Sequence, residues 1–207
     1  MSDQVELTNP VELSVGGMSG HVLRRGIHLA MSLLPFLYFE FGEDVADAVS
    51  LTLEQVVSSV ILIAVFGEAL RLKMGWTIVG QRSYEAKQVS ALAWGALGVG
   101  MVFLLAPEPE YAYPLILSLS LGDPLLGELR RKGVSTRTVI AAGTIGIALI
   151  WVACAIWVAT PWLLVPLMAP ICVAAEWPRL RYIDDNATML LIPLTVVLVF
   201  EPFLGII

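Results

Sequence analysis

The sequence predicts an all-α polytopic membrane protein with about seven transmembrane helices, an N-terminus in the cytoplasm and a C-terminus outside. Three observations support this fold class. Hydrophobic residues make up 57% of the chain and charged residues only 14%, and the mean hydropathy is +0.82, which excludes an ordinary soluble domain. The apolar residues form runs long enough to cross a bilayer. The basic residues are confined to alternate connections between these runs.

The apolar runs, each of about 15 to 22 residues, define the expected spans. They are 26–42, 55–71, 88–106, 111–129, 139–159, 162–177 and 187–206. The basic residues all lie before the first span or in the connections after the second, fourth and sixth: Arg24, Arg25, Arg71, Lys73, Arg82, Lys87, Arg130, Arg131, Lys132, Arg137, Arg179 and Arg181. Lysine and arginine mark cytoplasmic connections. A count of six or eight spans would scatter these residues over both sides of the membrane.

The chain is expected to form one membrane domain. Residues 24–207 make up this seven-helix domain, and residues 1–23 form a polar cytoplasmic segment that lacks the basic-then-apolar order of a signal peptide. Cys154 and Cys172 lie in apolar runs without metal-ligand spacing, so we interpret them as packing residues. We expect no nucleic-acid partner, and the sequence leaves the oligomeric state open.

Asp123 is a carboxylate within an otherwise apolar run. An ionised side chain at bilayer depth costs roughly 2.5 to 3.5 kcal/mol on insertion scales, so it usually faces a polar cavity or a partner. Gly122 and Pro124 flank it, and they predict that the helix is interrupted there, with Asp123 capping a second short helix. A broken helix inside a membrane normally lines a binding cavity.

Further polar residues gather on the expected cytoplasmic side. Asp184, Asp185, Asn186 and Thr188 open the last span and offer the hard oxygen ligands that Mg²⁺ uses together with substrate phosphates. Four bases lie at the same level and could hold phosphates: Arg71, Arg82, Lys87 and Arg137. Carboxylates and bases at one lipid interface indicate phosphoryl transfer.

Each of these groups also has a purely structural interpretation. Glu68 and Arg71 are three residues apart and could form an interfacial ion pair. His28 could be an interhelical hydrogen-bond donor, and Asp185 or Asn186 an ordinary helix N-cap. The bases that follow Glu128 could be interfacial anchors.

The ordered set of motifs resembles the family of polyprenol (dolichol) kinases, phytol kinases and CTP-dependent diacylglycerol kinases. The matching pieces run from residue 24 to residue 193: Arg24-Arg-Gly-Ile-His28, Glu68-Ala-Leu-Arg71, Arg82-Ser-Tyr-Glu85-Ala-Lys87, Leu121-Gly-Asp-Pro124, Glu176, and Asp184-Asp-Asn-Ala-Thr188 with Pro193. Family members follow the Gly-Asp with a longer glycine-rich loop that contains a Lys-Thr and then a Glu-Gly. Here that region is compressed to residues 130–138; Arg137-Thr138 stands in the Lys-Thr place, and the Glu-Gly is missing.

The resemblance implies transfer of the γ-phosphoryl group of a nucleoside triphosphate, CTP favoured, to the hydroxyl of an isoprenoid or related lipid alcohol. It implies a multi-pass protein of the cell membrane with its active site at the cytoplasmic face. Mg²⁺ is the implied cofactor, with Asp123, Asp184 and Asp185 as its ligands, and one of these carboxylates or His28 as the proton acceptor. The implied nucleotide-binding residues are Arg71, Arg82, Lys87, Arg137, Asn186 and Thr188. The implied supporting residues are Glu68, Glu85, Glu128, Glu176 and Arg25.

Two other functions compete with this interpretation. A lipid cytidylyltransferase would use the same nucleotide, metal and lipid interface but attack the α-phosphorus; its C-terminal Lys-Asp and His-Gly-Gly signature is absent here. A small membrane transporter would also use a broken helix with a carboxylate inside the span. The outer halves of the spans, however, offer almost no charged residue to complete a transport pathway.

Overall fold

The computed structural model describes residues 10–106, 108–178, 180 and 182–204. Within these residues every regular element is helical, apart from one isolated bridge between Ser14 and Arg82. The α-helices are α1 (Pro10–Leu13), α2 (Gly17–Ala30), α3 (Leu34–Ala48), α4 (Leu53–Met74), α5 (Ala91–Leu105), α6 (Pro109–Arg131), α7 (Thr136–Trp157), α8 (Leu164–Ala175) and α9 (Asp185–Leu204). Two short 3-10 helices, η1 (Met31–Leu33) and η2 (Ser83–Lys87), complete the set.

Every expected span coincides with a helical segment, and the apolar composition of these helices is that of a membrane protein. Among the residues described, α4, α7 and α9 are long and apolar enough to cross a membrane, and α5 and α8 are shorter apolar helices. The first expected span corresponds to α2 and α3, which are joined through η1. Helix α2 begins at Gly17, within the expected N-terminal segment. Arg179 and Arg181, two of the bases used to assign the topology, lie outside the described residues.

The predicted interruption at Asp123 is wrong, because α6 runs continuously from Pro109 to Arg131 with Pro124 inside it. Proline removes the hydrogen bond to the carbonyl four residues earlier. In membrane helices, packing against neighbouring helices and Ser or Thr side chains offsets that loss. Packing supplies the compensation here, because α6 contacts α2, α7 and α9. The Ser120 Oγ donates to the Ile116 carbonyl at 2.9 Å and not to the carbonyl that Pro124 leaves free. Gly122 serves close packing instead, because a Cβ at this position would lie 3.1 Å from Ile147 of α7.

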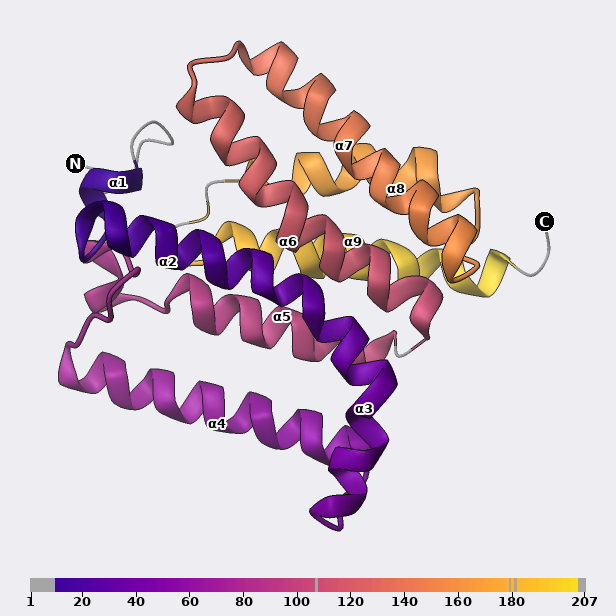
Figure 1. Ribbon diagram of the computed structural model, residues 1–207, viewed down its shortest axis with the longest axis horizontal. Helices are drawn as coiled ribbons and strands as arrows, with labels where there is room; N and C mark the ends of the chain where they lie inside the picture. Colours follow the sequence, from indigo (N-terminus) through magenta and orange to yellow (C-terminus); the bar gives the residue numbers. More distant parts are fainter. Residues whose placement is uncertain (1–9, 107, 179, 181, 205–207) are drawn as a thin grey trace.

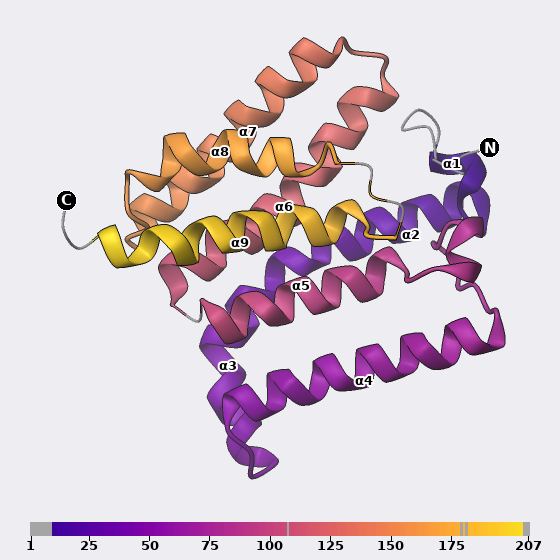
Figure 2. The same cartoon turned by 180° about the vertical axis from the view of Figure 1, so that it is seen from behind.

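Helix α6 forms the centre of the molecule (Figure 1). It packs against α7, α9 and α2, and α5 continues the bundle toward α4, which lies at the outside (Figures 1 and 2). The core between α6, α7 and α9 contains fully buried Leu119, Ile147 and Met189. A buried hydrogen bond from the Trp151 indole N–H to Ser118 Oγ, 2.9 Å long, joins α7 to α6.

The start of α2, the end of α4, η2 and the start of α5 lie at the same end of the bundle (Figure 1). The C-terminal part of α6 and the start of α9 face this region as well (Figures 1 and 2). Most of the predicted site residues belong to these segments. The fold therefore brings polar segments from distant parts of the sequence together at one end of an apolar bundle.

Candidate functional site

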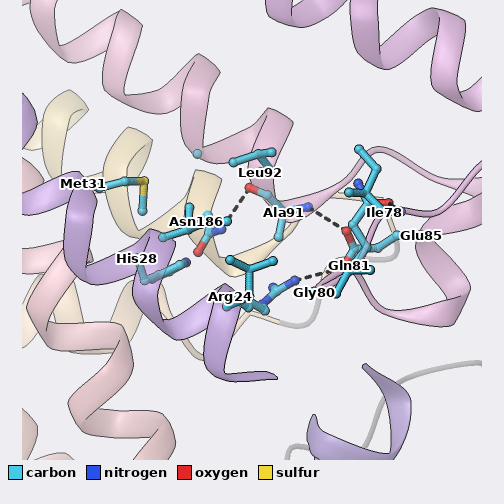
Figure 3. Close-up of a pocket in the computed structure, with 14 residues that line it drawn as sticks. Arg24, His28, Met31, Ile78, Gly80, Gln81, Glu85, Ala91, Leu92 and Asn186 are labelled. Atoms are coloured by element: carbon cyan, nitrogen blue, oxygen red, sulfur yellow. Dashed lines mark hydrogen bonds and ion pairs between the residues drawn. The ribbon is translucent and has the colours of Figure 1, made fainter. Parts of the chain in front are cut away.

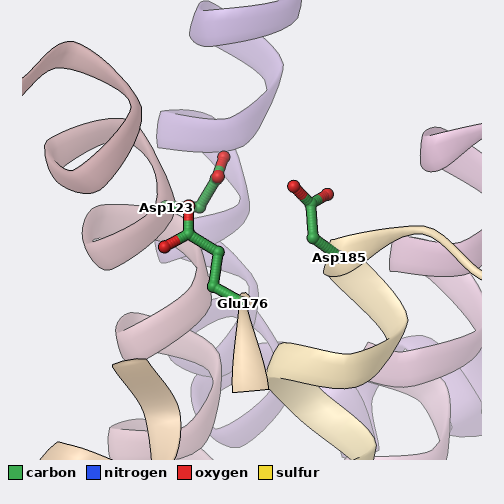
Figure 4. Close-up of side chains that lie close together, drawn as sticks. All are labelled: Asp123, Glu176 and Asp185. Carbon is green, nitrogen blue, oxygen red and sulfur yellow. The ribbon is translucent and has the colours of Figure 1, made fainter. Parts of the chain in front are cut away.

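Three carboxylates from three segments form an acidic cluster: Asp123 of α6, Glu176 at the C-cap of α8, and Asp185 at the first position of α9 (Figure 4). One carboxylate oxygen from each lies within 4.8 Å of the others. The Glu176 side chain is completely buried, whereas 21% of the Asp123 side chain is exposed. Within the described part of the chain, this is where His, Cys, Asp and Glu side chains could hold a metal ion.

The cluster agrees only in part with the predicted metal ligands. Asp123 and Asp185 meet as expected, but Glu176, predicted as a supporting residue, takes the place expected for Asp184. Asp184 precedes α9, and its Oδ1 accepts a hydrogen bond from the Asn186 backbone N–H at 3.2 Å. Its Oδ2 lies 4.0 Å from Nη2 of Arg24. Burial raises the pKa of Asp184 well above its usual range, and repulsion from the Asp185 carboxylate raises it further.

His28 lies directly beside the acidic cluster. Its ring is buried in α2, and Nδ1 lies 3.1 Å from Oδ2 of Asp123. The direction of this contact is not that of a hydrogen bond, and Nδ1 has no hydrogen-bond partner among the described residues. One helical turn earlier along α2, Arg25 lies against Gly127 of α6, where the missing side chain leaves room for its guanidinium group. The glycine lets α2 approach α6 closely enough for His28 to reach Asp123.

Glu176 also contacts a base. It forms an ion pair with Arg130 of α6, whose guanidinium group lies 5.5 Å from the centre of the Trp177 ring. Neither Glu176 oxygen has a hydrogen-bond partner in the described residues, although both are buried. A buried carboxylate without hydrogen bonds is costly unless a cation or another donor compensates it. Arg130 compensates the buried charge of Glu176, and one Glu176 oxygen also lies in the acidic cluster.

Arg82 belongs to the connection between α4 and α5, and it faces the two aspartates at the start of α9. Its Nη1 donates to the Tyr84 hydroxyl at 2.7 Å, and its buried Nε has no hydrogen-bond partner in the part of the chain that the structure describes. Burial lowers the pKa of Arg82, but Tyr84, Asp185 and Asp184 together raise it above its usual value. Arg82 is therefore a cation at the rim of the acidic cluster, and its predicted phosphate-binding role stays a prediction.

Glu85 organises the connection around Arg82. It is almost fully buried and accepts hydrogen bonds from Arg24 Nη1 at 3.0 Å, from the Arg82 backbone N–H at 3.1 Å and from the Ala91 backbone N–H at 3.3 Å. Arg24 and Glu85 are separated by 61 residues in the sequence. The pair joins α2 to η2 and to the start of α5.

Arg71 is held in a separate network at the end of α4. Its Nε and Nη2 bind both oxygens of Glu68, at 2.8 and 2.7 Å, while Nη1 donates to the Trp76 carbonyl and Nη2 also donates to the Gln88 carbonyl. Glu68 in turn accepts a hydrogen bond of 2.6 Å from the backbone N–H of Ser90. These bonds make Arg71 and Glu68 a clamp that joins the end of α4 to the start of α5. The contacts agree with a structural role for the pair.

The remaining predicted residues have local or surface contacts. The Asn186 side chain donates to the Ala91 carbonyl at 2.9 Å, and Thr188 Oγ1 donates to the Asp185 carbonyl at 3.1 Å, so both fix the first turn of α9. Lys87 and Arg137 have exposed side chains. Glu128 forms ion pairs with its exposed neighbours Arg131, at 2.7 Å, and Lys132, at 3.9 Å.

Two bases that contact the site, Arg24 and Arg130, are not among the site residues predicted from the sequence. Arg24 lies one turn before His28 on the same face of α2, and that spacing is the signal that could have included it. Arg130 is one of three consecutive bases, and the sequence does not distinguish it from its neighbours. Only the packing of α6 against the end of α8 pairs it with Glu176.

No protein-family model, curated protein or solved structure matches the chain. Function therefore has to be inferred from the chemistry of the site. The site combines carboxylates that could hold a hard cation, a histidine next to one of them, and bases at their rim. Such a combination suits a reaction in which negative charge on phosphate oxygens has to be positioned and neutralised.

Proposed function

We propose that the protein is an integral-membrane lipid kinase. It transfers the γ-phosphoryl group of a nucleoside triphosphate, CTP favoured, to the hydroxyl of an isoprenoid or related lipid alcohol. The observation that carries the proposal is the convergence of Asp123, Glu176 and Asp185 at one end of an apolar helical bundle. Phosphoryl transfer depends mostly on positioning and charge neutralisation, which such a site can provide.

The residues present fit Mg²⁺. Its oxygen ligands lie at about 2.0 to 2.1 Å, so two ligands of one ion are at most about 4.2 Å apart. The oxygens of the cluster, within 4.8 Å of one another, need only small side-chain movements to meet that limit. Asp123 and Asp185 would hold the ion, with Glu176 as a third ligand if it leaves Arg130. When bound, Mg²⁺ would supply positive charge that neutralises the phosphates of the nucleotide.

The protein side chains have distinct roles in this proposal. His28 accepts the proton of the lipid hydroxyl, and the Asp123 carboxylate near its Nδ1 stabilises the positive charge that develops on the ring. Arg82 faces the nucleotide phosphates from the rim. The exposed bases Lys87 and Arg137 contact the nucleotide farther from the reacting atoms. Arg71 has a structural role, because its nitrogens are engaged with Glu68 and with backbone carbonyls.

The proposal includes the membrane topology. The helices correspond to seven spans with the site at the cytoplasmic face of the cell membrane, and the basic connections support this orientation. The uninterrupted course of α6 removes the broken helix on which the transporter alternative depends.

The test is transfer of radioactive label from nucleotide to lipid. Purified protein in lipid vesicles is incubated with γ-labelled CTP, ATP or GTP and a panel of isoprenoid, fatty and diradylglycerol alcohols. We expect Mg²⁺-dependent transfer of the γ-label from CTP into the organic phase, and loss of transfer in Asp123→Asn. Transfer of an α-label instead would support the cytidylyltransferase alternative, and absence of transfer from every nucleotide would contradict the kinase.

A further inference from the structure

An apolar pocket of about 130 Å³ lies between α2, α5 and the connection that leads to η2 (Figure 3). Its apolar walls come from all three segments: Leu23, Ile27 and Met31 of α2, Leu92 of α5, and Ile78 and Val79 of the connection. At Gly95 the wall is backbone alone. None of these residues belongs to the acidic cluster, so the pocket is a separate cavity next to it.

The mouth of the pocket is apolar and open. Leu23, Ile27, Ile78, Val79 and Leu92 have between 37% and 57% of their surface exposed. A contiguous apolar rim of this kind marks a lipid or ligand contact. In a chain with apolar helices of membrane-crossing length, it offers a lateral path from the hydrocarbon layer into the protein.

The inner end of the pocket reaches the acidic cluster. His28 and Asn186 both line the pocket. His28 is also the neighbour of Asp123, with Nδ1 3.1 Å from Oδ2, and Asn186 directly follows Asp185. A molecule whose chain occupies the pocket would therefore have its polar end next to the carboxylates.

The charges on the pocket wall favour a neutral ligand. Arg24 and Glu85 are the charged lining residues apart from His28, and they neutralise each other in an ion pair of 3.0 Å. Arg24 also lies 4.0 Å from Asp184, which reduces its attraction for a further anion. A hydroxyl group fits this environment better than a carboxylate or phosphate head group does.

We propose that this pocket binds the acceptor and that it selects a neutral alcohol with a single apolar chain. The inference rests on the proposed kinase function for the fate of the hydroxyl but not for the binding itself. A volume of about 130 Å³ is well below the roughly 300 to 1,000 Å³ of pockets for drug-sized ligands. It has room for the first part of one chain, with the rest lying in the lipid, and not for the two chains of a diradylglycerol.

Gly95 provides a way to fill the pocket. A Cβ at this position would meet Met31 Sδ at 3.7 Å and Asn186 Nδ2 at 3.8 Å, which are ordinary van der Waals contacts. Alanine therefore fits without displacing a neighbour, whereas the longer leucine side chain must extend into the pocket. Gly67 of α4 is the matched control, because it is exposed and a Cβ there would have no atom within 4 Å.

The test is photoaffinity labelling without nucleotide, with a diazirine-bearing analogue of geranylgeraniol in nanodiscs of phosphatidylcholine. We expect labelled peptides from α2 and α5 in the wild type, Gly95→Ala and Gly67→Leu, and about tenfold less labelling or lower still in Gly95→Leu. Ile78→Asp, at the exposed mouth, tests the site without altering the interior and lowers labelling as well. Geranylgeraniol competes with the probe, and dioleoylglycerol does not.

Equal labelling of Gly95→Leu and wild type, or competition by dioleoylglycerol, would overturn the inference. The outcome is separable from that of the kinase proposal. Specific labelling without any phosphoryl transfer leaves the pocket established and the kinase refuted. Phosphoryl transfer that is unaffected by Gly95→Leu leaves the kinase established and places the acceptor elsewhere.

Discussion

Nδ1 of His28 lies 3.1 Å from Oδ2 of Asp123, so that α2 and α6 meet at the one carboxylate that interrupts the apolar run of α6. The contact explains why a carboxylate is found there. Asp123 has a polar partner on one side and the carboxylates of Glu176 and Asp185 on the other. An ionisable residue within such an apolar run is expected to have a partner and a function.

The first prediction concerns His28 as proton acceptor. His28→Gln keeps a polar side chain but removes the basic nitrogen, and we expect kcat to fall by about 100-fold or more with little change in the KM for CTP. His21 is the other histidine of the chain and lies on the same helix, so His21→Gln is the matched control and should retain activity. A similar loss in both variants would indicate a structural effect on α2, and no loss in either would remove His28 from the mechanism.

The second prediction separates the Arg71 clamp from a phosphate ligand. Arg71→Gln leaves Glu68 buried without its cation, and we expect a loss of about 3 kcal/mol in the free energy of unfolding, while the folded fraction keeps its KM for nucleotide. Glu128 and Arg131 have the same spacing but are exposed, so Arg131→Gln should cost less than about 1 kcal/mol. A raised KM with unchanged stability in Arg71→Gln would show that Arg71 binds phosphate.

The third prediction is a pH dependence of stability that comes from Asp184. The folded protein raises the pKa of Asp184 well above 3.8, because burial and the Asp185 carboxylate disfavour the ionised form. The folded state therefore binds this proton more tightly than the unfolded state, and the free energy of unfolding decreases as pH rises from 3.8 through the raised pKa. Asp184→Asn cannot ionise, so in the absence of divalent cations its melting temperature should exceed that of the wild type increasingly as pH rises. A constant difference at every pH would contradict this explanation.

The fourth prediction is the proposed topology. The test uses variants with a single cysteine in place of Glu43, Glu108 or Arg131, all of which are exposed. A membrane-impermeant maleimide applied from outside should label the first two, and Arg131→Cys should react only from the cytoplasmic side. Labelling of all three from one side would refute the topology. The native Cys154 and Cys172 are buried, so they give a low background.

The sequence predicts the helices of this fold well because long apolar runs carry the information locally. Its error at Asp123 has a physical reason. Gly122 and Pro124 are breaking signals in an isolated helix, but here the glycine allows contact with Ile147 and the neighbouring helices support the proline. Tertiary packing overrides the local signal.

The site is predicted less completely than the helices, for a related reason. The sequence identifies Asp123 and Asp185 because each is conspicuous in its own segment. It does not show that Glu176 joins them in the acidic cluster, since that depends on how the end of α8 packs against α6. The Arg24–Glu85 pair likewise depends on a contact between distant segments.

The central claim is that Asp123 and Asp185 share one Mg²⁺–nucleotide site, and a double-mutant cycle tests it most directly. The cycle compares Asp123→Asn, Asp185→Asn and the double variant for Mg²⁺-dependent nucleotide binding and for thermal stability without metal. The control is Glu128→Gln, a partly exposed carboxylate of α6.

We predict that either single variant abolishes most of the Mg²⁺-dependent binding and that the double variant loses little more, because the first substitution already removes what the second would contribute. Without metal, Asp123→Asn should raise the melting temperature, since it relieves repulsion from the close carboxylates of Glu176 and Asp185. Asp185→Asn also removes the attraction of Arg82 and Arg24 for this carboxylate, so it should raise the melting temperature less. Additive losses of stability with unchanged Mg²⁺ dependence would show that the two aspartates act independently, and would contradict the shared site.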